Sequence, residues 1–383
     1  MSVTAPAGFR AAGVTAGLKA SGDPDVALVV NDGPENAAAG VFTTNKVVAA
    51  PVRWSRQVLR WNALRAVVLN SGGANACTGP DGFADTHHTA ERVATLLRLA
   101  PIDVAVCSTG LIGVRLDMAA LMKGVDLAVA ALAADGGADA ARAIMTTDTR
   151  SKEAVAARGG VTVGGMAKGA GMIAPGMATM LSVITTDALV SPAMAQVALE
   201  RAVEQTFNRV DSDGCMSTND SVILMANGAS GSTLDDIALS DLLTEVCGSL
   251  ARQMVGDAEG ASKDILIEVS GAASEEDAVA AARAVARSNL FKCAMYGEDP
   301  NWGRILSAVG TSSATFEPDH IGVAINGVEV CRNGFGYGDP AAADLSGRQI
   351  TVAIDLDAGR YRGHVWTNDL TPEYVHENSA YST

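Results

Sequence analysis

The chain has 383 residues, and 48% of them are hydrophobic, which is enough to build a core and excludes a disordered protein. Its formal net charge of −15 and aromatic content of 4% argue against a broad surface for nucleic acid or anionic membrane. No run approaches the roughly 20 apolar residues of a membrane-spanning helix, residues 1–22 lack a signal-peptide pattern, and the six cysteines are scattered. We therefore expect a cytoplasmic protein with neither nucleic-acid nor membrane partners.

The first half of the chain alternates strand-like and helix-like patterns. We predict strands at 25–31, 41–52, 65–70 and 104–107, and a helix at 91–99 with its apolar residues at helical spacing. Two of these strands run into loops of small residues, at 71–75 and 108–110, as in βα units. The alternation predicts an α/β fold.

The second half opens with a glycine-rich stretch at 161–176, after which we predict a strand at 178–185. Ser191 with Pro192 marks the start of a helix, and Ser274 with Asp277 marks another that runs to residue 286. Further strands at 221–225 and 265–269, a helix at 241–255, and an Asn326-Gly327 hairpin complete the pattern. No repeat or linker marks a domain boundary.

Several common catalytic sites are missing from the sequence. The five histidines are not at metal-ligand spacing, so we expect no metal site. There is no phosphate-binding Gly-x-x-x-x-Gly-Lys-Ser/Thr loop, and the glycines at 169 and 171 lack the third glycine of a dinucleotide fingerprint. No Gly-x-Ser-x-Gly elbow presents a serine nucleophile.

The segment from Lys168 to Thr179 remains as a candidate for catalysis. Pro175 and Gly176 favour a tight turn just before Thr179. Attack of the Thr179 hydroxyl on the carbonyl of Ala178 would give an ester, and hydrolysis would make Thr179 a new N-terminus whose α-amine can serve as base. From the residues alone the ordinary explanation is the stronger one, because a threonine at the start of a strand is usually just a β-branched strand former.

The order of several segments resembles the ornithine acetyltransferase family, also called glutamate N-acetyltransferase, of arginine biosynthesis. The resemblance covers essentially the whole chain. The segments that carry it are 70–76, 108–113, 145–149, 164–181, 217–220, 259–261, 299–304 and 378–383.

The resemblance implies a layered α-β-β-α fold and self-cleavage between Ala178 and Thr179. Chains 1–178 and 179–383 would stay associated, as a heterotetramer with two copies of each. Thr179 would take an acetyl group from N-acetylornithine and pass it to glutamate, without a cofactor because the acetyl donor is itself a substrate. No motif decides whether acetyl-CoA also serves as donor.

The resemblance also assigns roles to individual residues. Thr109 and Gly110 match an oxyanion hole, which would stabilise the tetrahedral intermediate. Lys168 can meet a carboxylate and Glu259 an ammonium group. The family's substrate-binding positions fall on Thr146, Lys168, Thr179, Glu259, Asn378 and Thr383.

This chain departs from the family pattern at two places. Cys215 stands where many members have an acid, and His376-Glu377 replaces a basic-then-apolar pair. Neither touches the nucleophile segment, but both bear on substrate contacts. Two alternatives stay open: an aminopeptidase or amidase with the same N-terminal nucleophile, and a non-catalytic binding protein.

Overall fold

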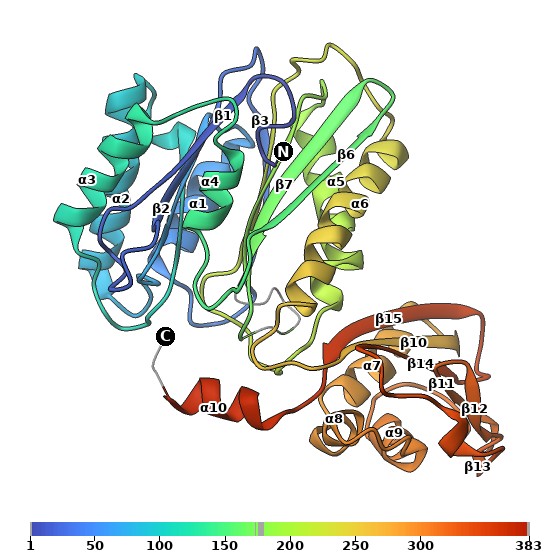
Figure 1. Ribbon diagram of the computed structural model, residues 1–383. Coiled ribbons are helices and arrows are strands. Elements are labelled where there is room, and N and C mark those ends of the chain that lie inside the picture. The colour runs from blue at the N-terminus through green and yellow to red at the C-terminus, as the bar shows by residue number, and fades with distance from the viewer. Residues whose placement is uncertain (1, 173, 175–179, 381–383) are drawn as a thin grey trace. The chain divides into compact units, whose positions relative to one another are not determined.

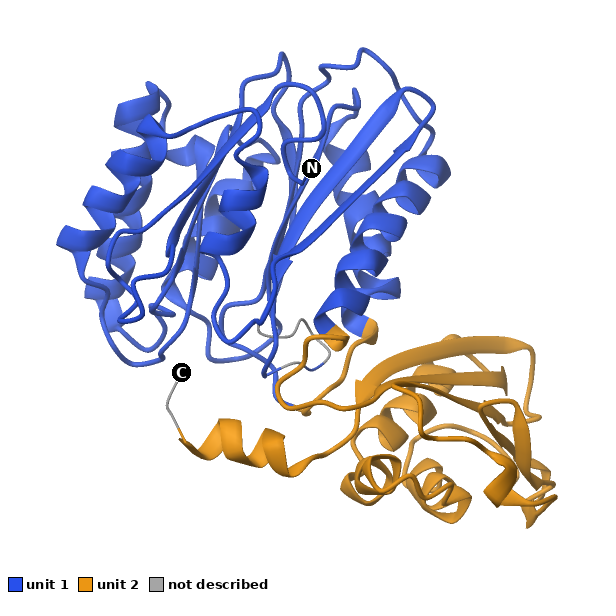
Figure 2. Cartoon of the chain, in the orientation of Figure 1, with its two compact units in different colours: residues 1–208, 215–254, 383 blue, residues 209–214, 255–382 orange. Residues whose placement is uncertain are grey.

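The computed structural model describes residues 2–172, 174 and 180–380. These form two compact units (Figure 2). Unit 1 contains residues 2–208 and 215–254, and unit 2 contains 209–214 and 255–380. The chain therefore passes from one unit to the other three times, at sites that carry no linker composition. The predicted chains 1–178 and 179–383 do not coincide with these units, so that division stays a proposal.

The first sheet of unit 1 has four strands in the order β1-β2-β4-β5. Every residue of β2, β4 and β5 is buried, which explains their nearly continuous apolar sequence. β4 and β5 are parallel, whereas β1 and β2 pair antiparallel. The strands are β1 (Phe9–Val14), β2 (Val26–Asn31), β4 (Ala66–Ser71) and β5 (Val104–Thr109), and the helices are α1 (Ala50–Val58), α2 (Gly79–Leu97), α3 (Met118–Ala130) and α4 (Gly137–Ala143).

The second sheet of unit 1 has five strands in the order β3-β9-β8-β7-β6. β8 and β9 are parallel, and β7 pairs antiparallel with β8 from Val163 opposite Thr186 to Lys168 opposite Leu181. The strands are β3 (Ala37–Phe42), β6 (Lys152–Arg158), β7 (Val161–Lys168), β8 (Leu181–Thr186) and β9 (Ser221–Ala226), and the helices are α5 (Pro192–Gln205) and α6 (Asp236–Val255).

The two sheets of unit 1 face each other across a shared core. Val67 and Val106 of the first sheet belong to the same buried cluster as Met166, Val183 and Ile223 of the second. Helices α1, α2 and α3 lie outside the first sheet, and α5 and α6 lie outside the second (Figure 1). The predicted layering, helices outside paired sheets, is confirmed.

The predicted strand at 41–52 is wrong. β3 ends at Phe42, and α1 begins at Ala50. Pro51 lies in the first turn of α1, where a missing N–H costs no hydrogen bond, so this proline starts a helix and does not end a strand. The helix predicted at 91–99 is the second half of the longer α2.

Local start and turn signals were read correctly elsewhere. The Ser191 hydroxyl accepts a hydrogen bond from the Met194 amide at 3.2 Å, and that of Ser274 accepts one from the Asp277 amide at 3.1 Å. Asn326 and Gly327 both have positive φ, at 47° and 81°, as a two-residue hairpin turn requires. Of the strand predicted at 178–185, residues 178 and 179 lie outside the described residues, and β8 begins at Leu181.

Unit 2 is a six-stranded sheet with helices packed on it. Alternate residues of the central strands, such as Ile265, Ile267, Val352 and Ile354, are buried in one core with helical residues such as Val285. The strand order is β13-β12-β11-β14-β10-β15. The strands are β10 (Asp264–Ala272), β11 (Gly322–Ile325), β12 (Val328–Arg332), β13 (Phe335–Gly336), β14 (Gln349–Asp355) and β15 (Tyr361–Asn368), and the helices are α7 (Glu275–Ala286), α8 (Asn289–Tyr296), α9 (Trp302–Val309) and α10 (Pro372–Ala380).

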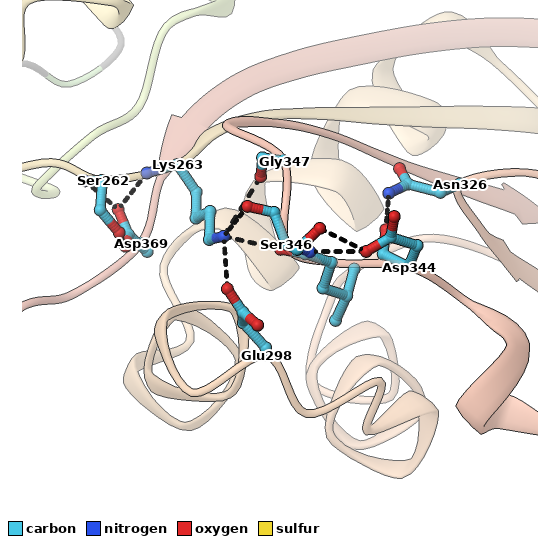
Figure 3. Close-up of polar contacts among 9 residues, drawn as sticks. Ser262, Lys263, Glu298, Asn326, Asp344, Ser346, Gly347 and Asp369 are labelled. Carbon is cyan, nitrogen blue, oxygen red and sulfur yellow. Dashed lines mark hydrogen bonds and ion pairs between the residues drawn. The ribbon is translucent and has the colours of Figure 1, made fainter.

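A buried lysine fixes the start of β10 (Figure 3). Lys263 donates to the carbonyl of Leu345 at 2.6 Å and forms an ion pair with Glu298 at 3.0 Å. The carboxylate of Asp369 accepts from the amides of Ser262 and Lys263. These contacts hold the chain just after Glu259 in one conformation. Within the described part of the chain, no helix is long and apolar enough to cross a membrane.

Candidate active site

The predicted oxyanion-hole residues lie where the first sheet of unit 1 ends. Thr109 is the last residue of β5, and its carbonyl accepts from the amides of Gly72 and Gly73, each at 3.0 Å. Gly110 has a φ of +126°, and a Cβ there would lie 2.6 Å from the Gly73 nitrogen. The close approach of these two loops therefore requires glycine at position 110.

Replacement of Gly110 by alanine is expected to displace the 72–73 loop and to lower acetyl transfer more than tenfold. Gly113 is the matched control, because it also has a positive φ, +84°, but a Cβ there has no neighbour within 4 Å. Gly113→Ala carries only the backbone penalty, on the order of 1–3 kcal/mol. Equal losses of activity in the two variants, measured beside their melting temperatures, would contradict this role of Gly110.

Three buried amide and hydroxyl side chains connect this loop to the second sheet. The Asn219 side chain donates to the carbonyl of Ser108 at 2.8 Å and to that of Ala74 at 2.6 Å. The Ser108 hydroxyl donates to the Asn70 side chain at 2.6 Å, and Asn70 donates to the Gly73 carbonyl. Such fully paired buried groups hold the backbone around Thr109 rigidly.

Lys168, at the end of β7, brings a positive charge to Thr109. Its side chain is 1% exposed, and its Nζ lies 3.2 Å from the Thr109 hydroxyl oxygen. A hydroxyl that accepts a hydrogen bond keeps its own proton for donation. Thr109 can therefore donate to a developing oxyanion while Lys168 supplies positive charge beside it.

Asp148 organises the residues behind Lys168. Its carboxylate accepts from the Thr146 amide at 3.0 Å and from the Gly169 amide at 2.7 Å, and it pairs with the buried Lys152. Burial raises the pKa of Asp148, but the charges of Lys168 and Lys152 and the hydrogen bonds lower it further, to about 2. Asp148 is thus a fixed negative charge that positions Thr146 and Lys168.

Asp220, just before β9, lies beside the residue that follows Thr179. Its Oδ1 accepts from the Met180 amide at 2.9 Å, and its side chain is fully buried. Burial raises the pKa of this carboxyl well above its ordinary value, although hydrogen bonds from Met180 and Ser217 and the charge of Lys168 lower it.

The structure gathers four of the predicted residues in unit 1 and two in unit 2. Thr109 and Gly110 adjoin Lys168, and the amide of Thr146 is bound by Asp148, which Lys168 also faces. In unit 2, the Asn378 side chain donates to Glu259 Oε2 at 3.0 Å. Ala178, Thr179 and Thr383 lie outside the described residues.

Glu259 also lines a pocket of about 200 Å³ in unit 2. Asp213 and Asp369 add negative charge to its walls, and Arg287 and Lys292 add positive charge. Lys292 is 5% exposed, and burial lowers its pKa to about 8 although Asp213 and neighbouring acids raise it. Charges of both signs around a volume of this size suit a small amino acid.

The sequence reasoning assigned no role to Asp148, Asn219 or Asp220. All three residues are buried. Asn219 and Asp220 directly precede the apolar strand β9, and Asp148 lies in a run of threonines. A polar side chain directly beside a buried strand is a signal that could have marked Asn219 and Asp220, whereas no local sequence signal marks Asp148.

The comparisons with known proteins agree with the predicted family. A family model described as "ArgJ family" matches residues 10–383. The "Arginine biosynthesis bifunctional protein ArgJ" of Thermobifida fusca is 61% identical over the full length of both chains. A solved Mycobacterium tuberculosis ornithine acetyltransferase, in complex with ornithine, is 58% identical over 45% of this chain and 94% of its own, with a TM-score of 0.43. A solved ArgJ chain from Bacillus halodurans is 35% identical over 51% of this chain and 97% of its own, with a TM-score of 0.50.

The chain therefore belongs to the ArgJ family. The family predicted from segments such as 164–181 is confirmed, as is the expectation of an acyltransferase of arginine biosynthesis.

Proposed function

We propose that this chain is a glutamate N-acetyltransferase that moves the acetyl group of N-acetylornithine to glutamate, in the cytoplasm. The observation that carries the proposal is the family match over residues 10–383. The unit 1 site adds physical support, because Lys168 and Thr109 place positive charge and a donor where an oxyanion would form.

The nucleophile of the reaction is Thr179, freed by cleavage after Ala178. Its hydroxyl attacks the acetyl carbonyl of N-acetylornithine, ornithine leaves, and the acetyl ester is then attacked by the amine of glutamate. Thr109 and Gly110 stabilise the oxyanion of both steps, and the α-amine of Thr179 serves as base. Acetyl-CoA is a second candidate donor for the same ester.

Cleavage at residue 178 would not separate the two chains. β3, β6 and β7 come before the cut and β8 and β9 after it, yet the five strands form one sheet in the order β3-β9-β8-β7-β6. The solved Bacillus halodurans chain, 97% of which matches 51% of this one, is about half as long as this chain, as a cleavage product would be. We extend the proposal to a heterotetramer with two copies of each chain, which a sedimentation measurement would count.

The residues proposed to contact substrate are Thr146, Lys168, Thr179, Glu259, Asn378 and Thr383. Lys168 suits a carboxylate and Glu259 suits an ammonium group. The pocket that Glu259 lines carries charges of both signs, which suits a small amino acid.

An assay with N-acetylornithine and glutamate separates this function from its alternatives. We expect N-acetylglutamate and ornithine in equal amounts, because the acetyl group passes from one amine to the other. Release of acetate without N-acetylglutamate would identify an N-terminal-nucleophile amidase. Binding of N-acetylornithine without any product would identify a non-catalytic binding protein. Addition of acetyl-CoA and glutamate alone tests the second donor.

A further inference from the structure

The segment that leads into α10 is tied to the loop that carries Glu259. The Asp369 carboxylate accepts from the Ser262 amide at 3.0 Å and from the Lys263 amide at 2.9 Å, and the Ser262 hydroxyl donates to it as well (Figure 3). Asp369 is 5% exposed, so water competes little for these hydrogen bonds. The chain therefore enters α10 from a point that is fixed beside this loop.

Thr371, the residue just before α10, makes two hydrogen bonds with its hydroxyl group. It donates to the Gly260 carbonyl at 2.6 Å and accepts from the Tyr374 amide at 3.0 Å. The second bond is that of an N-cap, which stabilises the start of a helix by binding an amide of its first turn. One hydroxyl thus starts α10 and attaches it to the loop next to Glu259.

Gly260 allows the loop to approach the backbone of α10 closely. Its φ is +59°, and a Cβ there would lie 2.3 Å from the Tyr374 nitrogen and 2.6 Å from the carbonyl carbon of Glu373. Atoms at these distances overlap, and both neighbours are backbone atoms, which cannot turn aside as the end of a side chain can. Any side chain at position 260 would therefore push the helix away from the loop.

These contacts bring two of the residues proposed to contact substrate together. Thr371 and Asn378 are seven residues apart, about two turns of an α-helix, so both lie on the face of α10 that meets the loop. The Asn378 side chain donates to Glu259 Oε2 at 3.0 Å and to the Tyr374 carbonyl at 3.0 Å. The orientation of the Glu259 carboxylate thus depends on where α10 lies.

The same two segments form one side of the pocket in unit 2. Glu259 comes from the loop, and Asp369, Leu370 and Tyr374 come from the start of α10 and the residues before it. The pocket holds about 200 Å³, the size of a small amino acid. A shift of α10 would therefore change the shape of the pocket and move the carboxylate that lines it.

We propose that Thr371 and Gly260, together called the latch, are positioning residues that hold α10 on the loop and so orient Glu259 and Asn378 toward an ammonium group of the substrate. The inference rests on the proposed function, in which Glu259 and Asn378 contact substrate. The latch itself acts only through these two residues. Groups that are held in place before the substrate arrives lose less conformational freedom on binding, so the latch should act on KM more than on kcat.

Gly260→Ala tests the latch most directly. Misplacement of a binding group by about 1 Å can cost on the order of 10²-fold, so we expect kcat/KM for N-acetylornithine to fall by about 10–100-fold, chiefly through KM. Gly334→Ala is the matched control in unit 2, because Gly334 also has a positive φ, +77°, and a Cβ there would lie 2.6 Å from the Pro318 carbonyl oxygen. Equal losses of kcat/KM in the two variants would overturn the inference.

Thr371→Val removes the hydroxyl and keeps the shape of the side chain, whereas Thr371→Ser keeps the hydroxyl. Loss of an N-cap destabilises the start of a helix, so amide exchange in α10 should speed up by about 5–30-fold in Thr371→Val, as measured by hydrogen–deuterium exchange and mass spectrometry. KM should rise in the same variant, and Thr371→Ser should restore both values. Wild-type exchange in α10 together with a wild-type KM in Thr371→Val would overturn the inference.

A double variant shows whether the latch acts through Asn378. In Asn378→Ala the contact with Glu259 is already lost, so adding Thr371→Val should raise KM little further. Fully additive effects of the two substitutions on KM would overturn the inference. Absence of N-acetylglutamate with the wild-type chain would instead refute the proposed function, and the exchange measurement on α10 would still test the latch.

Discussion

Replacement of Thr179 by alanine is expected to leave a single uncut chain of 39.0 kDa and to abolish acetyl transfer. The variant has no hydroxyl to attack the Ala178 carbonyl, so neither the ester nor the free α-amine can form. Loss of a catalytic nucleophile lowers kcat by as much as about 10⁶-fold in well-studied hydrolases, so the residual rate should be close to background. Intact mass and N-acetylglutamate formation measure the two effects.

Two further variants separate chemistry from packing. Thr179→Ser keeps a hydroxyl at the same position and should retain cleavage and transfer. Thr185→Ala removes a buried threonine of β8 whose hydroxyl donates to the Val3 carbonyl at 2.7 Å. It should lower stability yet still be cut, so an uncut Thr185→Ala chain would show that any disturbance of this strand blocks cleavage.

Replacement of Lys152 by methionine is expected to destabilise the chain by up to about 3–5 kcal/mol, because it removes the ion-pair partner of the buried Asp148 carboxylate, which then keeps only the Lys168 charge and two backbone amides. Both side chains of this pair are 0% exposed. The Asp148 carboxylate also accepts hydrogen bonds from the amides of Thr146 and Gly169. We therefore expect the backbone at these two residues to become less rigid in the variant. Urea unfolding followed by circular dichroism measures the loss, with a shift of the midpoint at unchanged slope.

A surface pair provides the control for this ion pair. Arg142 and Asp139 form an i, i+3 pair with side chains more than half exposed. Arg142→Met should change stability by less than about 1 kcal/mol, because exposed pairs are solvated and screened. Similar losses for Lys152→Met and Arg142→Met would contradict the importance of burial.

The low pKa of Asp148 sets the direction of the acid dependence. An aspartate with a folded-state pKa of about 2 and an unfolded value of about 3.9 stabilises the folded chain fully above the unfolded value. That contribution is lost as the pH falls from about 4 towards 2. In Lys152→Met the folded-state pKa rises, so this part of the acid dependence should shrink.

Local signals in the sequence were sufficient for many elements but not for their assembly. The hydroxyls of Ser191 and Ser274 bind amides three residues on, and the Asn326-Gly327 turn needs only its own backbone, so adjacent residues determine these features. Pro51 was misread because a proline both ends strands and starts helices, and only the neighbouring packing decides between them. The two units were not predicted, since residues 209–214 join unit 2 through contacts distant in sequence.

The candidate site shows the same division between local and long-range information. Lys168 and Thr109 were named through the family resemblance, and they meet because β7 and β5 end at the same place in unit 1. Asp148 and Asp220 had no assigned role, because their importance comes from burial beside Lys168 and not from any spacing along the chain. The pairing of strands into sheets brings these charges together, and the order of the strands in a sheet cannot be predicted from a single sequence.

The most direct test of the acetyl-enzyme is the mass of the chain that begins at Thr179 after incubation with N-acetylornithine alone. With no acceptor present, the acetyl group should remain on the enzyme, and ornithine should be released in one equivalent per site. We predict a gain of one acetyl mass on the fragment 179–383, located by peptide analysis on Thr179 and lost when glutamate is added. An unmodified fragment together with full N-acetylglutamate production would contradict an acetyl-threonine intermediate.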